Sequence, residues 1–154
     1  FETGDGRGRS SMRDAAIVDT NVLVSRYDYR FPQKQARATE VLQQGVERGY
    51  AIPHQALLEF VSVVSRPLPP NGERLLEWDA VVREAEDLML QFDVLLPDAD
   101  VFRTALRGKL AYQMSWFDAH LWAFAERFDY PLLLSEDFQH RRFYGRVQAV
   151  NPFL

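Results

Sequence analysis

The sequence predicts an α/β protein with a mostly parallel sheet. Short apolar runs end at Val18 and Leu134 without alternating with polar residues, which is typical of strands covered on both faces. Segments whose apolar residues have helical spacing separate the candidate strands, as in repeated strand–helix–strand units. Because open α/β sheets place their chemistry at the carboxyl ends of the strands, Asp19, directly after the first run, is the first candidate functional residue.

The composition is that of a soluble globular protein. The 154 residues are 47% hydrophobic and 26% charged, enough for about one domain with a real core. The absence of cysteine excludes disulfides and thiolate chemistry and fits a cytoplasmic location. No apolar run approaches the roughly 18 residues of a membrane span. The net charge of −4 argues against nonspecific coating of a polyanion, and His54, His120 and His140 lack zinc-ligand spacing.

Residues 1–11 are small, polar and rich in glycine, and they precede Met12. We expect them to be a leader or linker, with Met12 as the native start and residues 12–154 as a single domain. Residues 65–72 contain the densest proline and glycine signals in the rest of the chain. At about eight residues this segment is expected to be a loop and not a domain boundary.

The elements follow from apolar spacing and from end signals. Gly49 suits the end of a helix, Asp98 suits a helix start, and Pro53 weakens the strand that contains it. We expect helices over residues 21–27, 33–49, 55–66, 73–90, 99–112 and 115–128. We expect strands over residues 15–18, 50–53, 92–96, 131–134 and 146–150.

Two acids follow all-apolar strands. Asp19 ends the first such strand and Asp137 follows the second, so both are expected at the same edge of a parallel sheet. Each has an ordinary alternative as a helix cap or turn residue. The neighbouring Glu136 competes with Asp137 for any role.

Two further acids are expected on helices. Glu59 lies on the narrow polar stripe of an otherwise apolar helix, and this stripe faces water, a cleft or a partner. Asp118 shares a helical face with Leu121 and Trp122, which points it inward, where only a cation or hydrogen bonds make an acid tolerable. Its alternative is a capping box that begins at Ser115.

Carboxylates that converge in one cleft repel one another, and a bound divalent cation removes that penalty. Mg²⁺ and Mn²⁺ prefer carboxylate and water oxygens. Such a cation polarises a phosphoryl oxygen and lowers the pKa of a bound water. The predicted chemistry is therefore metal-assisted hydrolysis of a phosphodiester.

With their flanking residues, these acids resemble the PIN-domain ribonucleases, and in particular the VapC-type toxins of bacterial toxin–antitoxin pairs. The resemblance extends roughly over residues 13–153, with anchors at 17–23, 57–60, 115–119, 133–138 and 150–153. It implies a three-layer α/β/α sandwich and a Mg²⁺- or Mn²⁺-dependent endoribonuclease. It also implies a homodimer and an antitoxin that covers the cleft.

The resemblance also implies roles for individual residues. The acidic, metal-holding set would be Asp19, Glu59, Asp118 and Asp137. Thr20, Asn21 or Ser135 would support this set through hydrogen bonds to carboxylates or metal-bound water. Many relatives have a longer loop before the last acid, so a role for Glu136 beside Asp137 stays open.

The RNA substrate requires cations near the acids. Arg141 and Arg142, just after Asp137, are the best placed, and a solvated surface is the alternative for any single cation. The other candidates are Arg26, Arg30, Lys34, Arg66, Arg107, Lys109 and Arg146. The alternative function is a catalytically inactive PIN-like module that binds RNA or a partner protein, and the intact acid set favours the nuclease.

Overall fold

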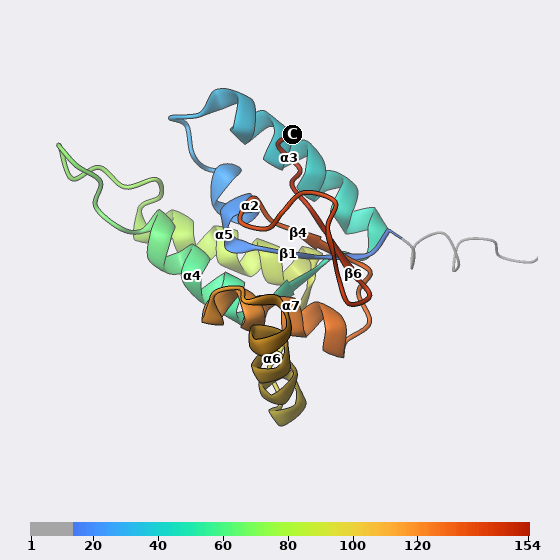
Figure 1. Cartoon of the computed structure of the whole chain (residues 1–154). Helices are drawn as coiled ribbons and strands as arrows, with labels where there is room; N and C mark the ends of the chain where they lie inside the picture. Colours follow the sequence, from blue (N-terminus) through green and yellow to red (C-terminus); the bar gives the residue numbers. More distant parts are fainter. Residues whose placement is uncertain (1–13) are drawn as a thin grey trace, which may run out of the picture.

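The computed structural model describes residues 14–154 (Figure 1), and in these residues the strands form one sheet. The strands are β1 (Ala16–Val18), β2 (Ala51–Pro53), β3 (Asp93–Leu95), β4 (Leu132–Leu134), β5 (Phe143–Tyr144) and β6 (Val147–Val150). Their order across the sheet is β3-β2-β1-β4-β6-β5. All neighbours are parallel except at one edge, where β5 pairs antiparallel with β6.

β1 lies in the interior of the sheet, where the order of the strands reverses. The chain builds outward from β1 through β2 to β3, and later returns to the other side of β1 as β4. Val18 of β1 is in register with Leu134 of β4, so these two strands end at the same level. Ligands of open α/β sheets bind at such a reversal point, outside the carboxyl ends of the strands. The residues after Val18 and Leu134 therefore occupy the favoured position for a site.

Helices cover both faces of the sheet, as Figure 1 shows. They are α2 (Thr20–Ser25), α3 (Pro32–Arg48), α4 (His54–Val64), α5 (Trp78–Gln91), α6 (Ala99–Tyr112) and α7 (Trp116–Arg127). In one buried cluster, the helices α2, α3, α4 and α5 pack on one face of the sheet. In a second cluster, α6 and α7 pack on the other face. Within β1, Val18 belongs to the first cluster and Ile17 to the second. The expected three-layer α/β fold with a mostly parallel sheet is confirmed.

The predicted helix-end signals are present in the structure. Asp98 caps α6, and its Oδ1 accepts a hydrogen bond from the Val101 N–H at 2.8 Å. Ser115 caps α7 by accepting from the Asp118 N–H at 3.2 Å. Gly49 closes α3 in the left-handed region, with φ of 73°, which a residue without Cβ adopts at little cost. Local sequence chemistry is therefore enough to define these three ends.

The helix expected over residues 73–90 is wrong at its start, because α5 begins only at Trp78. Glu73 instead forms an antiparallel bridge with Leu68, and the Leu76 N–H donates to the Val64 carbonyl at 2.9 Å. These bonds tie the segment before α5 back to the loop and to α4. Backbone pairing within the loop and with the end of α4 thus overrides a helical apolar spacing.

Two strands also differ from expectation. β2 is an interior strand, paired with β1 and β3, although a proline within a strand favours an edge position. Pro53 is the last residue of β2 and precedes α4, so only the end of the ladder lacks a donor. The two-residue β5 is absent from the expected strands, since it has no periodicity of its own and pairs through a tight turn at Gly145, whose φ is 65°.

The expected leader or linker, residues 1–11, lies outside the described residues, as does Met12. In residues 14–154, no helix combines the length and the apolar character that crossing a membrane would require.

Candidate active site

Asp19 follows β1 and lies in the sheet edge at the reversal point. Its backbone N–H donates to the Leu134 carbonyl at 2.9 Å, which extends the parallel ladder by one residue. Its Oδ1 accepts from the Thr20 N–H at 2.6 Å, so Asp19 is the N-cap of α2. Its Oδ2 accepts from the Ser135 hydroxyl at 2.6 Å. Asp19 therefore caps α2 with Oδ1 and contacts the other residues of the candidate site with Oδ2.

Ser135 and Asn21 join Asp19 to Asp137. The Ser135 side chain is fully buried, and its Oγ also accepts from the Asp137 N–H at 3.1 Å. Asn21 Nδ2 lies 3.1 Å from Asp19 Oδ2 and 3.2 Å from Asp137 Oδ2, and it donates to both carboxylates. The structure thus brings two predicted acids and two predicted supporting residues into one hydrogen-bonded network.

Glu59 reaches the same region from α4. The Thr20 hydroxyl donates to Glu59 Oε2 at 3.0 Å, and Gln55 Nε2 donates to Glu59 Oε1 at 3.2 Å. Since Thr20 is adjacent to Asp19, this contact places Glu59 beside the network. Glu59 is exposed, and it lines an open cavity together with Asp19 and Asp137.

Asp118 lies in the first turn of α7 and is half-buried. Its backbone N–H donates to the Ser115 hydroxyl, so Ser115 caps the helix as the capping-box alternative predicted. Burial raises the pKa of Asp118, the hydrogen bond with Ser115 lowers it, and the charges of Asp137 and Glu59 raise it further. Asp118 therefore lies within the electrostatic reach of the other acids, although it does not line the same cavity.

An open cavity of about 350 Å³ begins at the acids and extends along α2 and α3. Asp19, Glu59 and Asp137 line one part of it, and Phe31 and Lys34 line another. Lys34 forms an ion pair with Glu136, also in the lining, and its Nζ lies 4.9 Å from the centre of the Phe153 ring. Glu136 is thus neutralised by a lysine at the rim.

Asp19 has the most perturbed acid–base equilibrium at this site. Burial raises the pKa of Asp19 to about 7, the hydrogen bonds from Ser135 and Thr20 oppose this, and the charges of Asp137 and Asp118 add to it. A buried acid beside other acids is a frequent property of functional sites. A nearby cation would favour the ionised form and would therefore lower the pKa of Asp19, against the effects of burial and of the neighbouring acids.

The donor chemistry of these residues fits a hard divalent cation. Carboxylate oxygens are the ligands that Mg²⁺ and Mn²⁺ prefer, and Asp19, Glu59 and Asp137 present such oxygens to one cavity. In residues 14–154, no three or more Asp, Glu or His side chains already have the mutual arrangement of a finished metal site. The fit therefore concerns the kind of ligand present, and some side-chain adjustment would accompany binding.

The predicted RNA-binding arginines lie away from the cavity lining. Arg141 and Arg142 are exposed near the β5–β6 hairpin, and the Arg142 guanidinium lies 4.7 Å from the centre of the Tyr144 ring. The cation that lines the cavity is Lys34, which the sequence did not separate from other candidates. Only the packing of α3 against the site distinguishes it.

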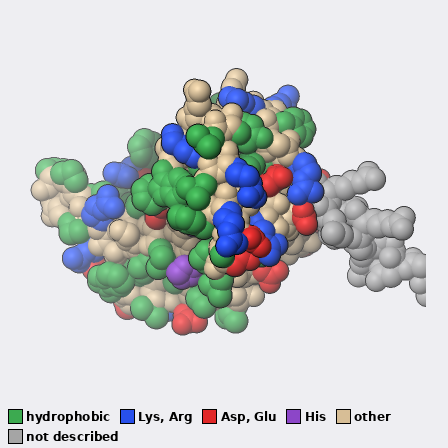
Figure 2. Space-filling view, turned by 60° about the horizontal axis from the view of Figure 1, so that its bottom comes forward, with side chains coloured by type: hydrophobic (Ala, Val, Ile, Leu, Met, Phe, Trp, Pro, Cys, Tyr) green, Lys and Arg blue, Asp and Glu red, His purple; other side chains and the backbone are tan. Residues whose placement is uncertain are grey.

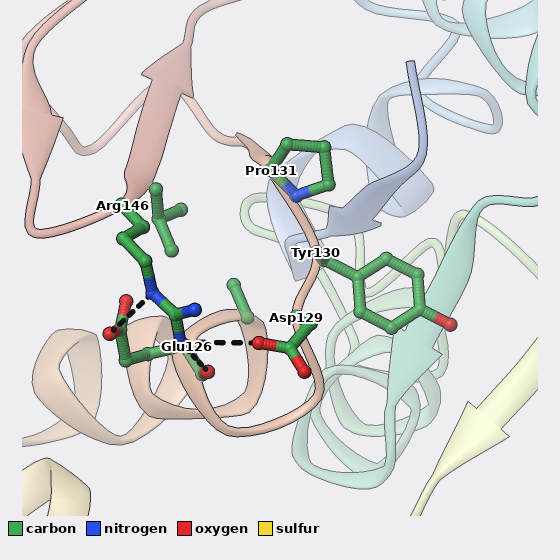
Figure 3. Close-up of a pocket in the computed structure, with 7 residues that line it drawn as sticks. Glu126, Asp129, Tyr130, Pro131 and Arg146 are labelled. Carbon is green, nitrogen blue, oxygen red and sulfur yellow. Dashed lines mark hydrogen bonds and ion pairs between the residues drawn. The ribbon is translucent and has the colours of Figure 1, made fainter. Parts of the chain in front are cut away.

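A second, smaller cavity of about 140 Å³ lies at the opposite, amino-terminal edge of the strands (Figure 3). Arg146 points toward both Glu126 and Asp129 there, with ion-pair distances of 3.4 Å and 3.1 Å. Arg146 is shared between these two carboxylates, and none of the predicted site acids lines this cavity. The predicted acids therefore gather at the carboxyl-terminal edge, where the candidate site lies.

The fold and the acids define an α/β protein with an acidic site at the reversal point of its sheet. The family model for the PIN domain matches residues 16–146, and the chain therefore belongs to the PIN domain family. The resemblance seen in the sequence is confirmed at that level. No curated protein matches the chain.

Several solved structures share the fold. A toxin–antitoxin complex from Klebsiella pneumoniae is 18% identical, with a TM-score of 0.64 over 89% of this chain and 97% of that chain. FitAcB from Neisseria gonorrhoeae is 17% identical, with a TM-score of 0.66 over 90% and 98%. VapC20 from Mycobacterium tuberculosis, described as a Sarcin-Ricin loop cleaving toxin, is 16% identical, with a TM-score of 0.57 over 77% and 86%.

Proposed function

We propose that this chain is a Mg²⁺- or Mn²⁺-dependent endoribonuclease that hydrolyses RNA phosphodiester bonds. The observation that carries the proposal is the buried Asp19 at the reversal point of the sheet, hydrogen-bonded through Ser135 and Asn21 to the neighbourhood of Asp137. Membership in the PIN domain family supports the same reaction class. The proposed domain comprises residues 12–154, of which the family model spans most.

In this proposal the acids hold the metal and the polar residues hold the acids. A bound divalent cation supplies a Lewis acid and an activated water. Asn21 orients Asp19 and Asp137 together, and Thr20 ties Glu59 to the same helix start. The proposed metal-holding residues are Asp19, Glu59, Asp118 and Asp137.

RNA would approach across the rim of the cavity. Lys34 is placed to contact a phosphate if its pairing with Glu136 is exchanged, and Arg141 with Arg142 would extend the cationic surface beyond Asp137. An RNA substrate is consistent with activity in the cytoplasm, where we propose that the chain acts.

We further propose that the chain is the toxin of a bacterial toxin–antitoxin pair. Its similar structures include a toxin–antitoxin complex and FitAB bound to a DNA fragment, which supports an antitoxin as partner. Phe102, Leu106 and Leu110 are exposed at successive helical turns of α6, and this stripe suits a homodimer. Figure 2, which brings the side of α6 forward, shows hydrophobic side chains beside Lys and Arg.

The test is cleavage of a mixed RNA pool by the purified chain in Mn²⁺, in Mg²⁺ and in excess chelator. We expect cleavage that requires the metal and that Asp19→Asn removes. Arg83→Gln, on the distant helix α5, is the matched control and should cleave like the wild type. Cleavage that survives saturating chelator would contradict the metal mechanism. RNA binding without cleavage under all conditions would favour the inactive RNA-binding module.

A further inference from the structure

A hydrogen-bonded chain leads from Glu59 to α7, on a route separate from the Asp19 network. Gln55 Nε2 donates to Glu59 Oε1 at 3.2 Å, and Gln55 Oε1 lies 2.5 Å from His120 Nδ1. Among the hydrogen bonds of residues 14–154, the contact between Gln55 and His120 is the one that joins α4 directly to α7. These two helices carry Glu59 and Asp118, so the chain links the supports of two acids.

The chemistry of the chain assigns the proton on the histidine. An ionised carboxylate only accepts hydrogen bonds, so the NH₂ group of Gln55 faces Glu59 and its oxygen faces His120. Two acceptors cannot share a contact this short, and Nδ1 of His120 therefore carries a hydrogen. In the neutral ring Nε2 is then unprotonated, because a neutral imidazole has a single N–H.

The hydrogen-bonded series is held by packing at His120 and is exposed to solvent at Glu59. The His120 ring lies edge-on to Phe124, with ring centres 5.2 Å apart, and Phe124 is fully buried. Glu59, in contrast, is exposed and is not held by packing. A free glutamate side chain keeps considerable rotamer entropy, so its orientation depends on the bonds from Gln55 and Thr20.

We propose that Gln55 and His120 are positioning residues that hold the Glu59 carboxylate toward the acidic cavity. His120 orients the Gln55 amide, and the amide then orients Glu59. The inference rests on the proposed function, since Glu59 has a catalytic role only if the acidic cavity is the nuclease site. Its first test nevertheless depends on structure alone.

The first test is the tautomer of His120, read from long-range ¹H–¹⁵N spectra of the labelled full chain near pH 8. We expect the Nδ1–H form in the wild type, although free histidine in water favours Nε2–H. In Gln55→Leu the Nε2–H form should gain population, because the acceptor for Nδ1–H is gone. A wild-type ring in the Nε2–H form would overturn the assignment and the chain with it.

The second test is kinetic. Gln55→Leu and His120→Leu should each lower kcat about tenfold with KM little changed, because they misplace a group without removing a substrate contact. The double variant should be no worse than either single one, since both break the same chain. His120→Asn should recover most of the loss, because its amide N–H can replace Nδ1–H.

The controls separate this inference from simple damage and from failure of the proposed function. Gln44→Leu removes an equivalent amide-to-carboxylate contact, with Glu40 on α3, and should leave kcat unchanged. Unchanged melting temperatures in all variants would locate the effect at the site. If Gln55→Leu keeps wild-type kcat, or if His120→Asn is as slow as His120→Leu, positioning is wrong. If the wild type itself cleaves no RNA, the proposed function fails. The tautomer test still decides whether the hydrogen bonds from Glu59 through Gln55 to His120 exist.

Discussion

The hydroxyl of Ser135 donates to Asp19 Oδ2 across 2.6 Å, and this bond joins the residues that immediately follow β1 and β4. Both side chains are buried, and Ser135 Oγ simultaneously accepts from the Asp137 N–H. One small side chain therefore determines how two acids, far apart in the sequence, lie relative to each other. Its effect can be measured through the acid–base equilibrium of Asp19.

Replacing Ser135 by alanine should raise the pKa of Asp19 above its wild-type value of about 7. The hydrogen bond from Ser135 lowers that pKa against the larger effect of burial, so its loss leaves burial and the neighbouring charges less opposed. The measurement is a carboxyl ¹³C titration of Asp19 without metal. Ser62→Ala, on the outer part of α4, is the control and should leave the titration where it is. An unchanged or lower pKa in Ser135→Ala would contradict this relationship.

Asp19→Asn should stabilise the metal-free protein at pH 8 and have much less effect at pH 4. The pKa of Asp19 is raised on folding from 3.8 to about 7. The protonated acid is therefore tolerated below pH 4, and the unfolding free energy falls as Asp19 ionises and the pH rises through 7. A shift of this size corresponds to at most about 4 kcal/mol of unfolding free energy at pH 8. Urea unfolding at both pH values checks it. An equal effect at both would show that Asp19 does not titrate in this range.

Mn²⁺ should stabilise the protein more at pH 8 than at pH 6. A cation must displace the proton that the raised pKa of Asp19 retains at the lower pH, so metal affinity rises with pH through this interval. The melting temperature is followed against Mn²⁺ concentration at both pH values. Asp118→Asn should bind more weakly, and the distant Asp79→Asn serves as its control. Equal stabilisation of the wild type and Asp118→Asn would remove Asp118 from the proposed ligand set.

Neutralising Arg141 and Arg142 together, as Arg141→Gln with Arg142→Gln, should weaken RNA binding and flatten its salt dependence. For a single-stranded substrate, removing one cation–phosphate contact reduces the slope of log K against log salt by about 0.7. Binding is measured in the Asp19→Asn background, so that cleavage does not interfere. Arg103→Gln with Arg83→Gln removes the same charge from α6 and α5 and should retain the wild-type slope. A slope that does not change in the first pair would leave the cavity lysine, Lys34, as the better candidate.

Gly108→Ala should destabilise the fold without changing the acids. An added Cβ on α6 would overlap the Trp122 ring on α7, and relieving that overlap requires the two helices to move apart. Overpacking of this kind costs about 1–3 kcal/mol of unfolding free energy. Chemical denaturation checks it, with Lys109→Ala on the exposed side of the same helix as the control. If Gly108→Ala has the same unfolding free energy as the wild type, α6 and α7 adjust freely to the added methyl group.

Much of the local structure could be read from the sequence. Asp98 and Ser115 cap helices as predicted, Gly49 ends α3, and the apolar runs form β1 and β4. These features depend on residues a few positions apart, where capping chemistry and apolar spacing act directly. The start of α5 and the short β5 could not be read in this way, because each depends on backbone pairing that leaves no periodic pattern in its own residues.

For the candidate site, the residue types could be predicted from the sequence: one acid directly after a buried strand, one three residues after another, one on a polar stripe, and one in the first turn of a helix. The three-dimensional packing was needed to show that β1 and β4 are neighbours, that Lys34 and not Arg141 lines the cavity, and that Gln55 connects Glu59 to His120. The physical reason is one of range. Capping and apolar spacing act over one or two helical turns, whereas strand order and side-chain packing depend on every segment that competes for the same sheet edge.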